Sequence, residues 1–251
     1  MGVTWNCFPT GKYYPGISEA MADALAESEV SVAGLASTFD AQARWQDLPL
    51  VVVDFETTGL SAESDRVLEI GMVCIDAGVV TEVENILINP GIPVPEEASA
   101  VHGITDEMLA DAPVFSACCE RIARRLTGRI PVAYNASFDA PFLRAEWARA
   151  GADATNIPAL SPEVTWLDPL VWVREVQKYE KGKKLTDVCA RMGIELTAAH
   201  RAAGDAEATG KVLLALAPQL PAAYGEVVRN QQHYAQAQEK EFAAWRARRR
   251  P

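Results

Sequence analysis

The sequence predicts an α/β fold in which helices flank a mixed β-sheet, and three observations lead to this prediction. Residues 50–55 are mostly apolar and rich in valine, which is typical of a buried strand. Two more strands follow at residues 66–76 and 79–90, joined by the tight turn Ala77-Gly78, which requires antiparallel neighbours. Beyond residue 113, segments with helical spacing alternate with short apolar strands, as expected for helices packed on a sheet.

Each later element has its own signal in the sequence. Residues 114–128 repeat apolar side chains at helical spacing and end at a glycine, and residues 137–151 end in the same way. Residues 130–135 read as a short buried strand between these two helices. The remaining elements are expected at residues 164–173, a strand running into a helix, and at two helices, 184–194 and 204–220.

The chain is predicted to have three parts. Residues 1–47 form an N-terminal extension that begins irregular and becomes alanine-rich and helical. Residues 48–220 form the main domain, and residues 221–251 form a C-terminal helix with a basic tail. The tail is either a solvated end or a contact for a nucleic-acid backbone or a partner. Its basic residues are Arg246, Arg248, Arg249 and Arg250.

Composition limits the classes of function. The net charge is −11 over 251 residues, which argues against a basic protein that coats nucleic acid but allows an enzyme that holds a few nucleotides. No apolar run is long enough to cross a bilayer, so no membrane role is expected. The five cysteines are odd in number and lack a metal-binding spacing, which indicates free thiols in a reducing cytoplasm.

Two carboxylates stand on the first predicted strand. Asp54 and Glu56 are two residues apart, so both side chains project to one side of the strand. Their separation along the strand is about 6 to 7 Å. Like charges this close repel each other, and Mg²⁺ or Mn²⁺, which prefers oxygen ligands, would relieve that repulsion. Thr57, Thr58 and Gly59 follow at a sharp turn that offers hydroxyls and amides to a sugar or phosphate oxygen.

Further candidate ligands come later in the chain. Asp139 and Asp205 each lie early in a predicted helix, where a structural helix-start role is the alternative. Asn135, before the first of these helices, has the alternative of a plain turn residue. His200 lies in a polar, alanine-rich loop five residues before Asp205, where no core would hold it. Each of these signals is weak when taken alone.

Four segments in order carry a stronger signal: DFETTGL, VHGITDEML, YNASFDAPFL and HRAAGDAEAT. Together they resemble the motifs of the DnaQ-like 3′–5′ exonucleases of the DEDDh class, in the ribonuclease H-like superfamily. That family includes the proofreading subunit or domain of bacterial DNA polymerases, such as the polymerase III epsilon type. The resemblance covers residues 50–216. It implies a ribonuclease H-like fold with a five-stranded mixed sheet, flanked by helices and carrying helical extensions at both ends.

The resemblance also implies roles for single residues. His200 would be the general base. The ligands of two divalent metal ions, Mg²⁺ or Mn²⁺, would be Asp54, Glu56, Asp139 and Asp205. The pocket for the terminal nucleotide would be lined by Thr57, Thr58, Gly59, Leu60, His102, Asn135 and Phe138. Tyr134 departs from the family pattern, because many members carry histidine there, and residues 1–47 have no counterpart in a minimal exonuclease domain.

The expected function is a metal-dependent 3′–5′ exonuclease that cleaves the terminal phosphodiester of single-stranded DNA and releases nucleoside 5′-monophosphates. It would act alone or with a polymerase or repair partner bound through the terminal extensions. Two alternatives stay open. One is trimming of RNA 3′ ends by the same chemistry, and the other is a non-catalytic, exonuclease-like binding module.

Several conspicuous residues are expected to be structural or solvated. Glu69 is interpreted as structural despite its charge. The tryptophans at positions 147, 166 and 172 are predicted to lie in the core rather than to stack on bases. The basic residues of one loop are expected to be solvated: Lys178, Lys181, Lys183 and Lys184.

Overall fold

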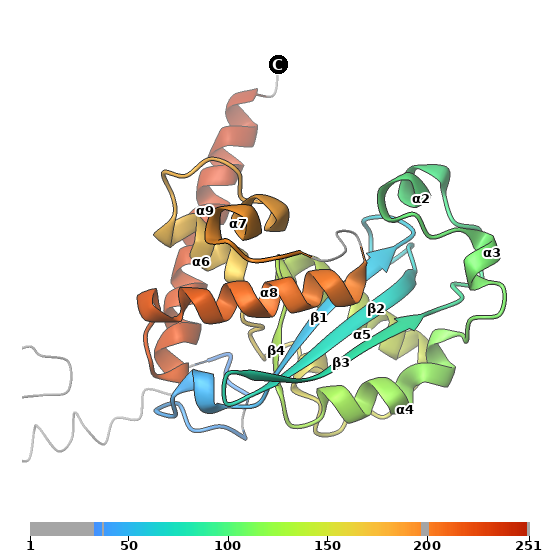
Figure 1. Ribbon diagram of the computed structural model, residues 1–251, viewed down its shortest axis with the longest axis horizontal. Helices are drawn as coiled ribbons and strands as arrows, with labels where there is room; N and C mark the ends of the chain where they lie inside the picture. The colour runs from blue at the N-terminus through green and yellow to red at the C-terminus, as the bar shows by residue number, and fades with distance from the viewer. Residues whose placement is uncertain (1–32, 37, 197–200, 250–251) are drawn as a thin grey trace, which may run out of the picture. The chain divides into compact units, whose positions relative to one another are not determined.

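The computed structural model describes residues 33–36, 38–196 and 201–249. Its centre is a mixed sheet with strand order β3-β2-β1-β4 (Figure 1). The strands are β1 (Leu50–Thr57), β2 (Val67–Asp76), β3 (Val79–Leu87) and β4 (Ile130–Val132). β1 pairs antiparallel with β2 and parallel with β4, while β2 pairs antiparallel with β3. The prediction of a mixed sheet flanked by helices is confirmed.

The hairpin between β2 and β3 forms where the sequence predicts it. Ala77 and Gly78 both have positive φ, 48° and 76°. That is the backbone of the two-residue turn whose twist matches antiparallel strands. Glycine adopts it at no steric cost.

The prediction of a fifth strand is wrong. Leu167 forms only an isolated parallel bridge with Val132, supported by its amide donating to the Pro131 carbonyl at 2.9 Å. Asp168 then caps α6 (Pro169–Val176) through its side chain. Because proline has a fixed φ and no amide hydrogen, Pro169 favours the first helical position and ends the extended segment after one bridge.

One face of the sheet is covered by α4 (Phe115–Leu126) and α5 (Ala136–Ala150). Alternate residues of β1, namely Val51, Val53 and Phe55, are buried in the core on this face. Trp147 of α5 is in the same core and packs edge-on against Phe115. Trp166 and Trp172 are also buried, so the prediction that the three tryptophans are core residues is confirmed.

The opposite face is covered by α8 (Ala202–Leu216), which lies across β1 and β2 (Figure 1). Two glycines allow this close approach. A Cβ on Gly71 of β2 would overlap the backbone of Ala202 and Ala203, and a Cβ on Gly210 would lie 2.8 Å from the Ile75 side chain. The first turn of α8 therefore lies directly on the strands, on the face to which Asp54 and Glu56 project.

The first residues of the described chain pack against the start of the last helix. α9 (Tyr224–Arg249) begins with a turn whose side chains are buried, including Tyr224 and Val228. The Tyr224 amide donates to the Ala43 carbonyl at 2.9 Å, and the Trp45 amide donates to the Ala222 carbonyl at 3.0 Å. Among the described residues between 33 and 47, the one helical element is a short 3₁₀ helix, Trp45–Asp47. The alanine-rich segment predicted to be helical, residues 18–45, lies mostly outside the described residues, and its described part forms no α-helix. The division into three parts stays a prediction.

The remaining elements connect these layers. In the described ranges no helix is both long and apolar enough to cross a membrane. Cys74, Cys118, Cys119 and Cys189 are buried and free, and Cys7 lies outside the described residues. The other elements are α2 (Glu96–His102), α3 (Asp106–Leu109), η2 (Pro158–Leu160), α7 (Leu185–Met192) and η3 (Ala217–Gln219).

Candidate active site

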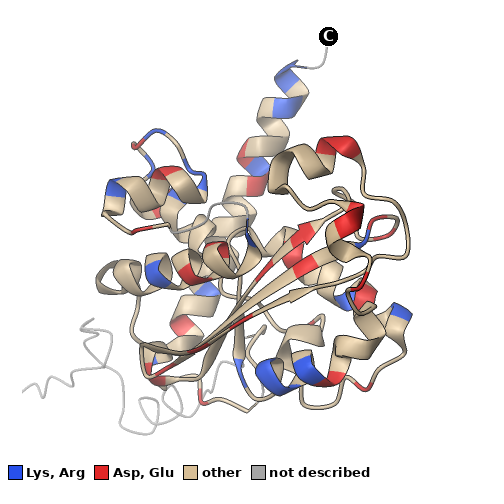
Figure 2. Ribbon diagram, turned by 45° about the vertical axis from the view of Figure 1, so that its right-hand side comes forward, with Lys and Arg blue, Asp and Glu red and all other residues tan. Residues whose placement is uncertain are grey.

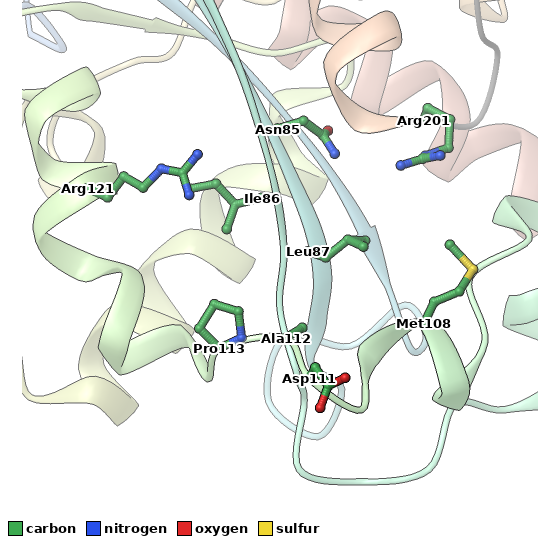
Figure 3. Close-up of a pocket in the computed structure, with 9 residues that line it drawn as sticks. All are labelled: Asn85, Ile86, Leu87, Met108, Asp111, Ala112, Pro113, Arg121 and Arg201. Atoms are coloured by element: carbon green, nitrogen blue, oxygen red, sulfur yellow. The ribbon is translucent and has the colours of Figure 1, made fainter.

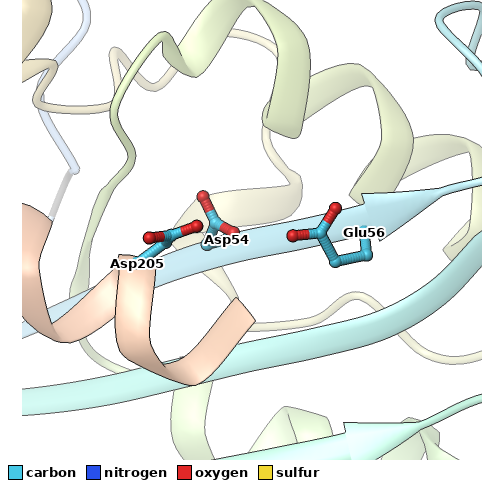
Figure 4. Close-up of side chains that lie close together, drawn as sticks. All are labelled: Asp54, Glu56 and Asp205. Carbon is cyan, nitrogen blue, oxygen red and sulfur yellow. The ribbon is translucent and has the colours of Figure 1, made fainter. Parts of the chain in front are cut away.

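The carboxylates of Asp54, Glu56 and Asp205 come together at one point above β1 (Figure 4). One oxygen from each of the three lies within 4.8 Å of the others, and all three residues are half-buried. The two β1 acids share a face because successive strand residues alternate in direction. Asp205 reaches them from the first turn of α8. This turn can lie directly against the sheet because Gly71 has no side chain in the way.

Asp139 approaches the same site from the first turn of α5 and is almost fully buried. It is outside the group of three mutually close carboxylates. Its charge nevertheless contributes to raising the pKa of Asp54, so the two acids are electrostatic neighbours. The backbone of Phe55 in β1 lowers the pKa of Asp139, against the larger effect of burial, so the start of α5 lies close to the strand.

The electrostatics of this site favour a bound cation. Burial, followed by the charges of Asp139 and Asp205, raises the pKa of Asp54 well above its usual value. Burial and the charge of Asp205 raise the pKa of Glu56 to about 7. Burial is also the main cause of the raised pKa of Asp139. Oxygen-only ligands of like charge in such a cluster fit a hard divalent ion, which would allow all of them to ionise.

Glu69 anchors the helix that carries Asp205. This fully buried carboxylate accepts hydrogen bonds from the Arg201 guanidinium at 2.6 Å, the Ala202 amide at 3.0 Å and the Asn85 side chain at 2.7 Å. Burial alone would raise the pKa of Glu69, but these hydrogen bonds outweigh it and lower the pKa. The interpretation of Glu69 as structural agrees with these contacts, and it ties strand β2 to the start of α8.

Asp168 anchors the other helix in the same way, and no sequence motif singles it out. Its buried carboxylate accepts hydrogen bonds from the amides of Asn135 and Ala136, both at 3.0 Å, at the start of α5. It also accepts from the Leu170 amide at 2.9 Å as the cap of α6. The one signal in the sequence is the Asp-Pro pair that begins a helix, which does not reveal the contact with α5.

The turn after β1 presents its two threonines inward. The Thr57 hydroxyl donates to the Gly59 carbonyl at 2.6 Å, and the Thr58 hydroxyl accepts from the Arg66 amide at 3.0 Å. Both threonines are buried, whereas Leu60 is 88% exposed at the tip of the turn. In this conformation the threonine hydroxyls order the turn, and Leu60 is the side chain presented to the surroundings.

The other residues predicted to bind the terminal nucleotide have different environments. His102 is buried, and its Nδ1 accepts from the Ile104 amide at 3.0 Å, which orders its loop. Asn135 is exposed at the start of α5 with φ of 75°. Phe138 is half-buried, with its ring 4.9 Å from that of Phe142. His200, the predicted general base, lies outside the described residues.

A cavity of about 460 Å³ lies beside the Glu69 contacts (Figure 3). Asn85 of β3, Arg201 and Met108 of α3 are among its lining residues. Asn85 and Arg201, which hydrogen-bond to Glu69, therefore also line this cavity next to α8. None of the described lining residues is one of the four predicted metal ligands.

Comparisons with known proteins agree with this geometry. An exonuclease family profile, RNase T, matches residues 51–213, more than half of the chain. The chain is 36% identical to the DNA polymerase III PolC-type of Bacillus cereus, over 65% of this chain and 11% of that protein. It is 37% identical to the DNA polymerase III subunit epsilon-like protein of Rhodobacter capsulatus, over 70% of this chain and 24% of that one. It is 32% identical to the 3′-5′ exonuclease DinG of Bacillus subtilis, over 68% of this chain and 18% of that one.

Solved structures show the same fold. E. coli exonuclease I, in a zinc-bound complex with single-stranded DNA, matches with a TM-score of 0.60 and 22% identity, over 69% of this chain and 41% of that one. Exonuclease X, in complex with 5′ overhanging duplex DNA, matches with a TM-score of 0.53 and 23% identity, over 71% of this chain and 99% of that one. Apart from the strand count, the predicted ribonuclease H-like fold is confirmed. The chain spans about a quarter or less of the length of its curated relatives.

Proposed function

Since the chain belongs to the RNase T exonuclease family, we propose that it is a metal-dependent 3′–5′ exonuclease that shortens single-stranded DNA and releases nucleoside 5′-monophosphates. The observation that carries this proposal is the group formed by Asp54, Glu56 and Asp205, whose carboxylate oxygens lie within 4.8 Å of one another. The raised pKa values of Asp54 and Glu56, together with the oxygen-only donors of the group, suit two divalent cations, with Mg²⁺ as the default and Mn²⁺ as the substitute.

The protein's part in the reaction is to position charged groups. Asp54 and Glu56 come from a rigid strand, while Asp139 and Asp205 come from two helices anchored by buried carboxylates. Ions bound by these four acids would polarise the terminal phosphodiester and activate water. We assign the proton transfer from that water to the His200 imidazole, since histidine titrates near neutral pH.

The choice of substrate rests on the relatives. Two of them are named as DNA polymerase III proteins and one as a 3′-5′ exonuclease, which supports DNA 3′ ends as the substrate and a polymerase or repair partner. The exonuclease I complex with single-stranded DNA supports a single strand. The same chemistry would cleave RNA, so tolerance of a terminal 2′-hydroxyl separates the two substrates. We place the enzyme in the cytoplasm, consistent with its buried free cysteines.

Several residues are proposed to hold the terminal nucleotide. Leu60 is the side chain that the turn after β1 presents, and it can pack against a base or sugar. Asn135 and Phe138 flank Asp139 at the start of α5. The backbone of the turn at Thr57, Thr58 and Gly59, together with the loop ordered by His102, completes the proposed pocket.

The direct test is digestion of a 5′-labelled single-stranded DNA oligonucleotide with Mg²⁺, beside an EDTA control and the Asp54→Ala variant. We expect a ladder that shortens from the 3′ end, absent in EDTA and reduced at least about a hundredfold in the variant, because even indirect partners of metal ligands cost 10- to 100-fold. His200→Ala should keep metal binding and lose about 10²- to 10⁴-fold in rate. No ladder on DNA or RNA, with either metal, would instead support the non-catalytic binding module.

A further inference from the structure

A second cavity, of about 570 Å³, lies between α5, α6 and α9. α5 contributes Asn135 and Arg144, α6 contributes Arg174, and α9 contributes Gln238 and Phe242. α9 lies beyond residues 51–213, so this wall of the cavity is outside the part of the chain that the exonuclease family profile matches.

The cavity is lined by two arginines, of which Arg174 also interacts electrostatically with the buried carboxylate of Asp168. Neither Arg144 nor Arg174 forms an ion pair with any residue that the structure describes. Arg144 donates one Nη2 hydrogen bond to the Ser161 carbonyl at 2.8 Å, while its buried Nε has no partner among the described residues. The guanidinium of Arg174 lies over the Phe242 ring, 4.9 Å from its centre.

The acids that line the cavity are already engaged. Asp168 accepts three backbone hydrogen bonds at the starts of α5 and α6. Glu239 is paired with Arg246 at 2.5 Å. The two arginines therefore remain the charged groups available to a ligand, and an anion is the kind of ligand they select.

Gln238 and Phe242 of α9 also line the cavity. The amide nitrogen of Gln238 donates to the Val171 carbonyl at 3.0 Å, but its buried Oε1 has no partner among the described residues. Guanidinium donors and the aromatic ring of Phe242 together match the phosphate and the face of a nucleotide.

The cavity extends to the first turn of α5. Asn135 and Ser137 line it at the start of α5, and Asp139 lies in the same first turn. Beyond the cavity, α9 continues with Trp245, which carries Arg249 over its ring at 4.4 Å. Figure 2 shows basic residues along this end of α9, so positive and aromatic groups continue away from the active site.

We infer that this cavity binds a nucleotide of the single strand on the 5′ side of the one being removed, with Arg144 and Arg174 on backbone phosphates and α9 as the outer wall. The inference rests on the proposed function, because it takes the strand's 3′ end to be at the metal site. It assigns α9 to the substrate path.

Binding of a 5′-fluorescein-labelled dT12 oligonucleotide to the Asp54→Ala protein tests the inference without cleavage. Adding Arg144→Gln and Arg174→Gln should weaken binding about tenfold or more. The slope of the logarithm of the binding constant against the logarithm of the salt concentration should become shallower by about 0.7 for each phosphate that the protein no longer neutralises. The matched control adds Lys178→Gln and Lys181→Gln, which remove the same charge from exposed positions outside the cavity. Equal weakening in both proteins would overturn the inference.

Kinetics separate the cavity from the metal site. With Asp54 intact, the ratio of kcat/KM for dT12 to kcat/KM for the p-nitrophenyl ester of thymidine 5′-monophosphate should fall about tenfold in the arginine variant, since only dT12 has upstream phosphates. A ratio equal to that of the lysine control would contradict a strand contact. Should the wild-type protein hydrolyse neither substrate, the proposed function fails, while the binding comparison still decides the inference.

Discussion

At the scale of single residues, stability and function make opposite demands on Asp54 and Glu56. Burial and like charge raise the pKa of both, and the pKa of Glu56 reaches about 7. The folded chain without metal therefore retains protons that the unfolded chain would release. Metal binding would replace those protons, which couples pH, metal affinity and stability at one site.

We predict that the metal-free protein loses stability as pH rises. An acid whose pKa is higher in the folded state than in the unfolded state stabilises the fold fully at pH values below the unfolded-state pKa. This stabilisation is lost as the pH rises through the folded-state pKa. For Glu56 the window runs from its ordinary value of 4.5 to about 7. Thermal unfolding in EDTA should show a falling Tm across this window, and Mg²⁺ should raise Tm more above it than below it.

The Glu56→Gln variant is the control for this titration. It removes one acid of the cluster, so its Tm in EDTA should depend less on pH than that of the wild type. A Mg²⁺ effect on Tm that is equal on both sides of the window in the wild type would contradict the coupling.

At the scale of elements, two helices reach the site through one device. Glu69 holds the first turn of α8, and Asp168 holds the first turn of α5, each by accepting backbone amide hydrogen bonds in a buried setting. Each helix in turn carries one candidate metal ligand, Asp205 or Asp139. These anchors make Glu69 and Asp168 positioning residues rather than groups that touch the substrate.

We predict that Glu69→Gln changes the metal requirement more than it changes the fold. It weakens the bonds to Arg201 and Ala202, so unfolding should be easier by about 1 to 3 kcal/mol. The looser start of α8 should raise the Mg²⁺ concentration for half-maximal activity about tenfold or more. Glu63→Gln, at an exposed position, is the control. An unchanged Mg²⁺ titration in Glu69→Gln would limit that residue to a purely structural role.

We predict that Gly71→Ala separates helix α8 from the sheet. The added Cβ would overlap the backbone of Ala202 and Ala203, which cannot move without shifting Asp205. The cost should be about 1 to 3 kcal/mol, together with a large loss of activity. Gly91→Ala is the comparison, because it has positive φ but open space around it. Activity should fall in the Gly71 variant alone, measured below both unfolding temperatures.

At the scale of the whole molecule, α9 belongs to the packed body of the described chain. Tyr224, Val227 and Val228 are fully buried, and Gln231 binds both the backbone of Trp166 and the amide of Asp168. The start of α9 therefore reaches Asp168, which itself holds α5. Its far end, with Phe242 and Trp245, is exposed and carries the arginines.

We predict that Val228→Ala destabilises the entire described domain. The reduced packing should cost about 2 kcal/mol, and unfolding should remain a single transition with a lower midpoint. Val79→Ala, at a position 63% exposed, should change stability by less than about 0.5 kcal/mol. Calorimetry that shows a separate early transition for the Val228 variant would mean that α9 unfolds independently of the sheet.

The sequence by itself determined the features that repeat locally. Period-two alternation set the face of Asp54 and Glu56, the pair Ala77-Gly78 set the hairpin, and helical spacing gave α4, α5, α7 and α8 to within a few residues. The four motifs in order indicated the family, and the exonuclease profile agrees. Local pattern suffices for such features because neighbours in the chain generate them.

Only the tertiary structure decided what depends on contacts between distant residues. Glu69 meets Ala202 across 133 positions, and Asp168 meets Ala136 across 32, so neither anchor leaves a pattern in the local sequence. The same holds for the fifth strand, which hydrogen bonding and Pro169 reduced to one bridge, and for the short helices α2 and α3. Periodicity tells which face of an element is buried, whereas the partner on that face is selected by packing and hydrogen bonding in three dimensions.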